Sequence, residues 1–175
     1  MKANVTLSLF LMLVFSQTSF SQQKSREIKV GHLFHITIPE YMERTVGLNS
    51  AASIQFVSSP NDVAGFVIED SKEELKLADT SFATLKDFYF FFEKDFLSGL
   101  KARTISPVNE FRKNGKNYLE FDASYFDDEL KSEVCYYVCL IEEDTYYYKL
   151  ICWSAKENKE KFRPDFQRIA LSIHE

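Results

Sequence analysis

Short runs in which apolar side chains alternate with polar ones recur along the chain and predict β-strands. Over residues 33–38, bulky apolar residues alternate with His35 and Thr37 before Pro39 ends the run, which is typical of a strand with one buried face. Further runs rich in β-branched and aromatic residues have the length of strands. They cover residues 53–57, 64–69, 105–111, 118–126, 134–141 and 146–153. We therefore expect a sheet of about six to seven strands.

Turn-forming residues separate these runs and predict hairpins. Five such residues fill positions 58–62, and the dipeptide Asn114-Gly115 lies between two later runs. Because Asn and Gly both tolerate the positive φ of a type I′ turn, this pair is a strong hairpin signal. The acidic segment 142–145 divides the last two runs in the same way. Consecutive hairpins pair their strands antiparallel, so we expect an antiparallel sheet.

A phenylalanine-rich segment in mid-chain changes to the period of an α-helix. Its apolar residues recur at steps of three and four: Phe82, Leu85, Tyr89, Phe92, Phe96 and Leu100. Asp79, Thr80 or Ser81 is available as the N-cap, and Gly99 lies near the C-terminal end. The wide apolar face favours a helix over residues 82–100 that packs deeply on the sheet. A helix that binds a membrane or a partner is the alternative.

The end of the chain predicts a second helix. Its apolar residues recur at steps of four, three and four: Phe162, Phe166, Ile169 and Ile173. Pro164 fits the first turn, where its missing N–H breaks no hydrogen bond. The order of strands, helix, strands and helix predicts an α+β fold, with helices on both sides of the sheet as in an α/β/α sandwich. Since no linker, repeat or low-complexity segment divides residues 31–175, we expect one domain there.

The first residues have the composition of a signal peptide. A basic residue precedes an apolar run over 7–15, and the small residues Ser19 and Ser21 then fit a signal-peptidase site. We expect cleavage near Ser21, which removes residues 1–21, leaves residues 22–30 as a flexible N-terminus and exports the protein to the periplasm or the cell exterior. An uncleaved anchor is the alternative, but the run is well short of the roughly 20 residues that span a bilayer.

Composition and charge exclude one class of partner. The formal net charge is −5, and removal of the leader takes away a lysine and no acid. A nucleic-acid surface needs a basic face, so we expect no nucleic acid as partner. The 17 Phe and 9 Tyr supply ample material for a core, and no apolar stretch after the leader is long enough to span a membrane. The same rings could line a ligand pocket, although dense core packing is the favoured interpretation.

All three cysteines lie in the segment CYYVCLIEEDTYYYKLICW, residues 135–153, which raises the question of a thiol or metal site. Cys135 and Cys139 share one face of a strand but lie about 13 Å apart, at roughly 3.3 Å per residue. Cα separations beyond about 7 Å forbid a disulfide, so these two residues cannot bond to each other. We expect a central hairpin whose core face carries both of them together with Tyr148 and Cys152.

The third cysteine leaves one disulfide to consider. A symmetric turn centred on Glu143-Asp144 would place Cys135 directly opposite Cys152. A bond between them suits an exported protein. Direct cross-strand bridges are geometrically demanding, however, and a one-residue bulge would separate the two thiols. We therefore hold the Cys135–Cys152 disulfide as a hypothesis, based on this register and on the signal peptide.

Other candidate chemistry is sparse. His32 and His35 lie three residues apart on or beside the first strand, so they are expected on opposite faces, and His174 is next to the C-terminus. A histidine zinc site would have to be assembled from distant parts of the chain, and no ligand spacing favours one. Acidic clusters that could attract a hard cation such as calcium occur at 69–74, 127–129 and 142–144. None has EF-hand spacing, and solvated loops are the favoured interpretation.

Catalytic signatures are missing from the sequence as well. It contains no G-x-S-x-G, no H-E-x-x-H and no Gly-rich phosphate loop. A catalytic triad assembled from remote residues leaves no local signature and stays open. We assign no catalytic residue, no cofactor and no metal ligand, and we expect a protein that is not an enzyme.

Several segments together resemble the PsbP-like family. They are FHITIP at 34–39 with Tyr41, the phenylalanine-rich helix, the Asn-Gly hairpin, the strand YYYKLICW and the closing FRPDFQRIALSI. The resemblance covers about residues 30–173 and implies an antiparallel sheet between helices. It also implies roles without catalysis, because photosynthetic members of this superfamily are extrinsic subunits of a membrane complex and its Mog members bind the GTPase Ran. No ion- or partner-binding residue of those members matches a numbered position here.

The expected function is that of an exported, non-catalytic binding or accessory protein of the bacterial periplasm or cell envelope, with a protein or envelope component as partner. The alternative is a small-molecule or lipid-binding protein that uses a pocket between the sheet and the helix over 82–100. A small hydrolase with a site built from remote residues is the third interpretation.

Overall fold

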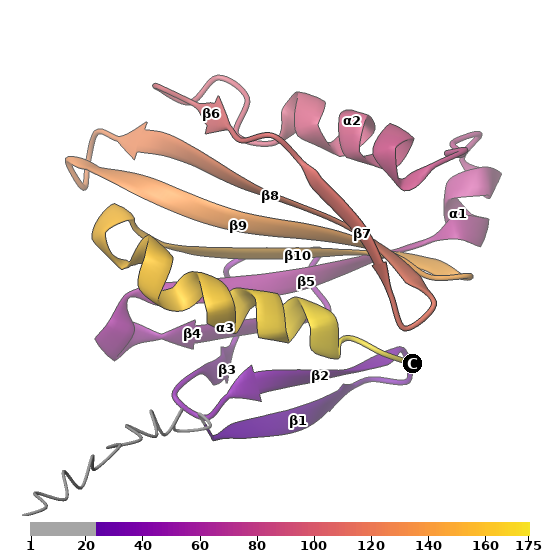
Figure 1. Cartoon of the computed structure of the whole chain (residues 1–175), viewed down its shortest axis with the longest axis horizontal. Helices are drawn as coiled ribbons and strands as arrows, with labels where there is room; N and C mark the ends of the chain where they lie inside the picture. Colours follow the sequence, from indigo (N-terminus) through magenta and orange to yellow (C-terminus); the bar gives the residue numbers. More distant parts are fainter. Residues whose placement is uncertain (1–23) are drawn as a thin grey trace, which may run out of the picture.

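Ten strands and three α-helices build residues 24–175, the part of the chain that the computed structural model describes (Figure 1). The strands are β1 (Ser25–Val30), β2 (Phe34–Pro39), β3 (Glu43–Thr45), β4 (Ile54–Ser58), β5 (Val63–Ser71), β6 (Thr104–Ile105), β7 (Asn109–Lys113), β8 (Lys116–Asp127), β9 (Ser132–Glu142) and β10 (Tyr146–Ala155). The helices are α1 (Lys72–Leu77), α2 (Leu85–Asp95) and α3 (Lys159–Ser172). Over these residues, no helix is long and apolar enough to cross a membrane. The predicted leader, residues 1–21, lies outside the described residues.

An antiparallel sheet of eight strands forms the middle of the molecule. Its strands follow the order β3-β4-β5-β10-β9-β8-β6, and β7 also pairs with β8. The hairpin β1-β2 is a separate two-stranded sheet. Helix α2 covers one face of the large sheet, while α3 and the β1-β2 hairpin cover the other (Figure 1). The predicted α+β class, with an antiparallel sheet flanked by helices, is therefore confirmed.

The hairpin signals in the sequence correspond to real turns. Asn114 and Gly115 have φ values of 51° and 83°. They connect β7 to β8 directly, since Lys113 pairs with Lys116 across the turn. Residues 58–62 likewise turn the chain between β4 and β5, with a positive φ at Asp62. The turn residues thus supply the left-handed backbone that these hairpins require.

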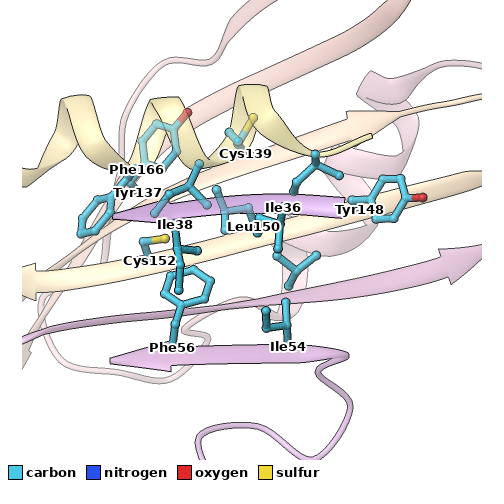
Figure 2. Packing of buried hydrophobic residues seen from close by; sticks show 14 of the residues in the cluster. Ile36, Ile38, Ile54, Phe56, Tyr137, Cys139, Tyr148, Leu150, Cys152 and Phe166 are labelled. Atoms are coloured by element: carbon cyan, nitrogen blue, oxygen red, sulfur yellow. The ribbon is translucent and has the colours of Figure 1, made fainter. Parts of the chain in front are cut away.

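The central strands are buried on both faces. Along β9, Tyr137 and Cys139 face α3, whereas Val138 and Leu140 face α2. On the α3 side, β10 contributes Tyr148, Leu150 and Cys152, which Figure 2 shows together with Ile36 and Ile38 of β2. Strands that are covered on both faces consist of nearly continuous apolar residues, which explains why the pattern of these two strands lacks a strict alternation.

Helix α2 is shorter than the segment 82–100 that the sequence predicts. It begins after Thr84, whose hydroxyl accepts a hydrogen bond from the N–H of Asp87, and the Asp87 carboxylate accepts one from the Thr84 N–H. This reciprocal pair is a capping box. Beyond the helix, Leu97 and Ala102 have positive φ. The chain leaves the right-handed helix at Phe96, whose backbone is extended, although the apolar spacing continues.

The prediction of a flexible N-terminus over residues 22–30 is wrong for Ser25–Val30. These residues form β1 and pair with β2 along its whole length, from Ser25 opposite Pro39 to Val30 opposite Phe34. Ile28 and Val30 alternate with charged residues and turn toward the core, where Val30 is buried. The polar start of this stretch conceals a strand with one apolar face.

The β9-β10 hairpin has a register different from the predicted one. Cys152 lies opposite Tyr137, and Cys135 lies opposite Ser154, so the predicted Cys135–Cys152 pairing is wrong. The turn occupies residues 143–146 and is closed by a hydrogen bond from the N–H of Glu143 to the carbonyl of Tyr146. Its centre therefore lies one residue later than the predicted centre, between residues 143 and 144. The cross-strand partner of each residue thus differs by two positions from the predicted one. Because side chains alternate with period two along a strand, every side chain keeps its predicted face.

Candidate functional site

Two histidines and a glutamate from three separate segments meet on the outer side of the β1-β2 hairpin. Glu27 lies on β1, His35 on β2, and His174 follows the end of α3. Within the hairpin, Lys29 is directly opposite His35, and Glu27 is two residues before Lys29. Side chains at these positions share one face because a strand alternates with period two. The apolar side chains of both strands point to the core, which leaves this face polar.

His35 and His174 are joined through their backbones. The N–H of His35 donates to the carbonyl of His174 at 2.6 Å, and the N–H of His174 donates to the carbonyl of His35 at 3.1 Å. This reciprocal exchange is an antiparallel bridge. The two imidazole rings stack with centroids 5.2 Å apart and an interplanar angle of 21°. The fold thus fixes the C-terminal segment against the edge of β2.

The polar atoms of these three side chains converge. The Glu27 carboxylate lies 3.8 Å from Nδ1 of His35 and 3.7 Å from Nε2 of His174. One donor atom from each residue lies within 4.8 Å of the other two. Nδ1 of His174 is 2.8 Å from the carbonyl oxygen of Ser172. Since a carbonyl only accepts, this nitrogen carries the proton that it donates to Ser172.

A hollow of about 320 Å³ opens beside His35. Its polar lining residues are Lys29, His32, His35, Thr145, Tyr146 and Glu175. His32 was expected on the face opposite His35, but it lines the same hollow, because Gly31 takes a positive φ of 57° and the chain turns there. The spacing of these residues in the sequence does not predict that they line one hollow. Their proximity depends on the turn at Gly31 and on the C-terminal residue Glu175, which lies beside β2.

A second polar cluster is buried between β8 and α3. Glu120 is only 5% exposed, and its carboxylate accepts hydrogen bonds from Tyr137 at 2.8 Å, Gln167 at 3.1 Å and Asn109 at 3.1 Å. Arg163 lies 3.8 Å away. Burial and the neighbouring carboxylate raise the pKa of the Tyr137 hydroxyl. Because a buried carboxylate needs several such partners, this network positions α3 on the sheet and leaves the carboxylate with little capacity for chemistry.

The same side of the sheet carries a second hollow, of about 310 Å³. Asp122 at its border pairs with Lys159 at 3.1 Å and with Arg163 at 3.3 Å. Cys135 also lines this hollow. Burial raises the pKa of its thiol, so the thiol is protonated at neutral pH and is a poor nucleophile.

The cysteines are free thiols in the described structure. Cys135 and Cys152 are diagonal neighbours across the β9-β10 hairpin, a relation that sets Cα atoms about 7–8 Å apart. That spacing exceeds the reach of a disulfide, so the register argues against the predicted bond. Complete burial raises the pKa of both Cys139 and Cys152 well above the ordinary value. These two side chains act as core residues.

Aromatic rings fill the space between α2 and the sheet. Phe88 stacks on Tyr147 with centroids 4.3 Å apart, and Tyr89 packs into the same cluster. Phe90 and Phe91 point outward and are more than half exposed. Neither hollow described above lies at this interface.

The acidic clusters are engaged with neighbouring cations or backbone groups. Glu142 pairs with Lys72 at 3.0 Å, and Asp70 pairs with Lys149 at 2.6 Å. The Asp127 carboxylate accepts hydrogen bonds from the backbone N–H groups of residues 129 and 130. The interpretation as solvated loops is wrong for Asp70 and Glu142, because they lie in β5 and β9, are partly buried and are paired with lysines.

Comparisons with solved structures identify the fold, although no protein-family model and no curated protein sequence matches the chain. The solution structure of a cyanobacterial PsbP from Synechocystis aligns over 92% of this chain and 98% of its own, with 14% identity and a TM-score of 0.63. The crystal structure of LpqN from Mycobacterium tuberculosis, a protein involved in cell envelope biogenesis, aligns over 86% of this chain and 89% of its own, with 12% identity and a TM-score of 0.56.

The architecture defines an α+β protein in which an antiparallel sheet lies between α2 on one face and α3 with the β1-β2 hairpin on the other. The chain has the PsbP-like fold, as the resemblance in its sequence predicts.

Proposed function

We propose that this chain is an exported accessory protein of the bacterial cell envelope that acts by binding a partner protein and not by catalysis. The observation that carries the proposal is the fold shared with LpqN, a protein involved in cell envelope biogenesis, and with PsbP. Neither of the two is described as an enzyme. The signal-peptide pattern over residues 1–21 supports the same compartment.

The chemistry of the polar clusters also supports a binding role. The buried carboxylate of Glu120 is held by Tyr137, Gln167 and Asn109. Burial keeps the thiol of Cys135 protonated at neutral pH. Both groups are thus explained by packing within residues 24–175, and neither is prepared as a nucleophile or a base.

The compartment is tested by expressing the protein with its own leader in a Gram-negative host and fractionating the cells. We expect a processed form in the periplasmic fraction whose N-terminal sequence starts near Gln22. A matched variant, Leu11→Arg, interrupts the apolar run over 7–15 that targets the chain. It should leave the full-length precursor in the cytoplasm.

Two results would count against this proposal. One is an unprocessed wild-type protein in the cytoplasm, with the same distribution as the Leu11→Arg variant. The other is turnover by the purified protein in a panel of hydrolase substrates, at a rate that survives a further purification step.

A further inference from the structure

We propose that Glu27, His35 and His174 form a binding site for a divalent transition metal, with Zn²⁺ as the ion that the donor set fits. The bound ion would fasten the C-terminal segment to the β1-β2 hairpin. The inference rests on the convergence of these three side chains and stands independently of the proposed function.

The donor set selects the class of metal. Two imidazole nitrogens and one carboxylate oxygen are ligands that suit Zn²⁺ and neighbouring transition metals, whereas Ca²⁺ and Mg²⁺ require oxygen ligands. Three protein ligands leave a fourth tetrahedral position for a water molecule or another small ligand. His35 lines the hollow of about 320 Å³, so a molecule in that hollow would have access to the region of the site.

The distances are close to those that coordination needs. Bonds of about 2.0–2.1 Å in a tetrahedral site separate ligand atoms by about 3.4 Å. Oε2 of Glu27 lies 3.8 Å from Nδ1 of His35, its Oε1 lies 3.7 Å from Nε2 of His174, and one donor atom from each residue lies within 4.8 Å of the other two. The imidazole rings stack at an interplanar angle of 21°, so binding requires both rings to rotate until their lone pairs converge on one ion.

The surrounding structure prepares both histidines. The reciprocal backbone bonds between His35 and His174 hold their Cα atoms in a fixed relation. The Nδ1–H of His174 donates to the Ser172 carbonyl, which is the outer-shell arrangement that orients a ligating imidazole and frees Nε2 for the metal. His35 is half-buried, so its ring has limited freedom. This order lowers the entropic cost of binding an ion.

The local charge is compatible with a cation. Lys29 lies opposite His35 on the same face and opposes metal binding by its charge. Its side chain is exposed, so it can extend into water, where its charge is screened. The carboxylate of Glu27 supplies the negative charge next to both imidazoles.

The site would add a link between the β1-β2 hairpin and the C-terminal segment, which hydrogen bonds between Thr37 and Ser172 already connect. The β1-β2 hairpin is not hydrogen-bonded into the eight-stranded sheet. Isolated two-stranded hairpins are marginally stable in water. Here the hairpin is held by its apolar face and by the bridge between His35 and His174. A metal that links Glu27 to His174 would stabilise this attachment.

Calorimetric titration of the purified, untagged protein with ZnCl₂ tests the proposal. A histidine tag is omitted because it binds the same ion. We expect one equivalent of zinc per chain, and an upward shift of the melting temperature by roughly 5 °C at a hundredfold excess of zinc over its dissociation constant. Cobalt(II) should give the intense visible absorption of a tetrahedral site.

Ligand variants and a matched control make the test specific. Removal of an outer-shell partner already weakens metal binding about 10- to 100-fold, so Glu27→Gln, His35→Ala and His174→Ala should each weaken it by at least about 100-fold. His32→Ala removes a histidine that lines the neighbouring hollow without belonging to the cluster, and it should bind zinc as the wild type does. Melting curves without metal show whether each variant is folded.

The proposal is overturned if the wild type binds no stoichiometric zinc, or if all four variants bind it with the wild-type affinity. It is equally overturned if His32→Ala abolishes binding while His174→Ala does not, because the site would then lie in the hollow and not at the cluster.

Discussion

At the scale of single residues, Gly65 accounts for the position of the Cys152 thiol. Gly65 on β5 lies opposite Cys152 on one side and opposite Phe56 on the other. A Cβ atom at Gly65 would lie 2.6 Å from Sγ of Cys152 and 2.7 Å from the Phe56 ring. The thiol and the ring therefore occupy the space that a side chain would take. The chemistry first suggested by the cysteine-rich segment is replaced by close packing in the core.

Replacement of this glycine tests the packing. Gly65→Ala should lower the free energy of unfolding by about 1–3 kcal/mol or more, because the added methyl overpacks a site with no space. Urea denaturation measures the change. Gly65→Ala combined with Cys152→Ala removes one of the two clashes and should recover part of the loss. Equal stability of Gly65→Ala and the wild type would contradict the packing described here.

The thiols themselves give a second prediction at this scale. In the folded protein, Cys139 and Cys152 should resist alkylation by iodoacetamide at pH 8, because both are fully buried and burial raises their pKa. After unfolding in urea without reductant, all three cysteines should be alkylated. Mass spectrometry counts the labels. Two unlabelled cysteines in the unfolded, unreduced protein would show a disulfide and contradict the register.

The sequence predicted part of this residue-scale picture. The faces of the central hairpin followed from Lys149, because strand alternation places Tyr148, Leu150 and Cys152 away from it. The residue opposite each cysteine could not be predicted, because it depends on which residues form the centre of the turn. Gly65 gave no signal either, because its role depends on neighbours from two other strands.

At the scale of elements, long periodic segments were predictable and short or polar ones were not. The apolar runs of β8, β9 and β10 gave strands, and the spacing of α3 gave a helix. Strand β1 was missed because its first residues are polar and only Ile28 and Val30 turn inward. The short α1 has no buried residue, so it has no apolar face that periodicity could detect.

The contacts of Glu142 join three elements and predict a dependence on pH. Its carboxylate accepts hydrogen bonds from Lys72 of α1 at 3.0 Å and from Asn117 of β8 at 2.9 Å. Burial alone would raise the pKa of Glu142, but these side-chain hydrogen bonds outweigh it and hold the pKa below the ordinary value of 4.5. The folded state thus favours the carboxylate. Its stabilisation is present above about pH 4.5 and is lost as the pH falls through the lowered pKa.

Glu142→Gln should therefore destabilise the protein by about 1 kcal/mol at pH 7, and the difference from the wild type should shrink as the pH falls to about 3.5. Urea denaturation at both pH values measures it. Glu129→Gln, at an exposed position, is the matched control and should have no effect at either pH. A deficit of Glu142→Gln that stays constant between the two pH values would show that the charge is not responsible.

At the scale of the whole molecule, the fold could be predicted from the sequence and the histidine cluster could not. Antiparallel hairpins, a central apolar sheet and two amphipathic helices define the layers, and their order resembles the PsbP-like family. The members of the cluster belong to β1, β2 and the C-terminal segment, which are distant along the chain. The pairing of β1 with β2 and the bridge between His35 and His174 bring them together. Sequence motifs for metal sites rely on ligands that are close together along the chain, so they do not detect the cluster of Glu27, His35 and His174.

The central claim, that the protein acts by binding a partner in the cell envelope, is tested most directly by cross-linking in intact cells. Cells that make the protein from its own promoter are treated with a membrane-permeable cross-linker, and the protein is recovered from the envelope fraction for mass spectrometry. The account predicts a reproducible adduct with one envelope protein, absent when the Leu11→Arg variant keeps the chain in the cytoplasm. An exported wild-type protein that forms no adduct, or the same adducts as the retained variant, would contradict it.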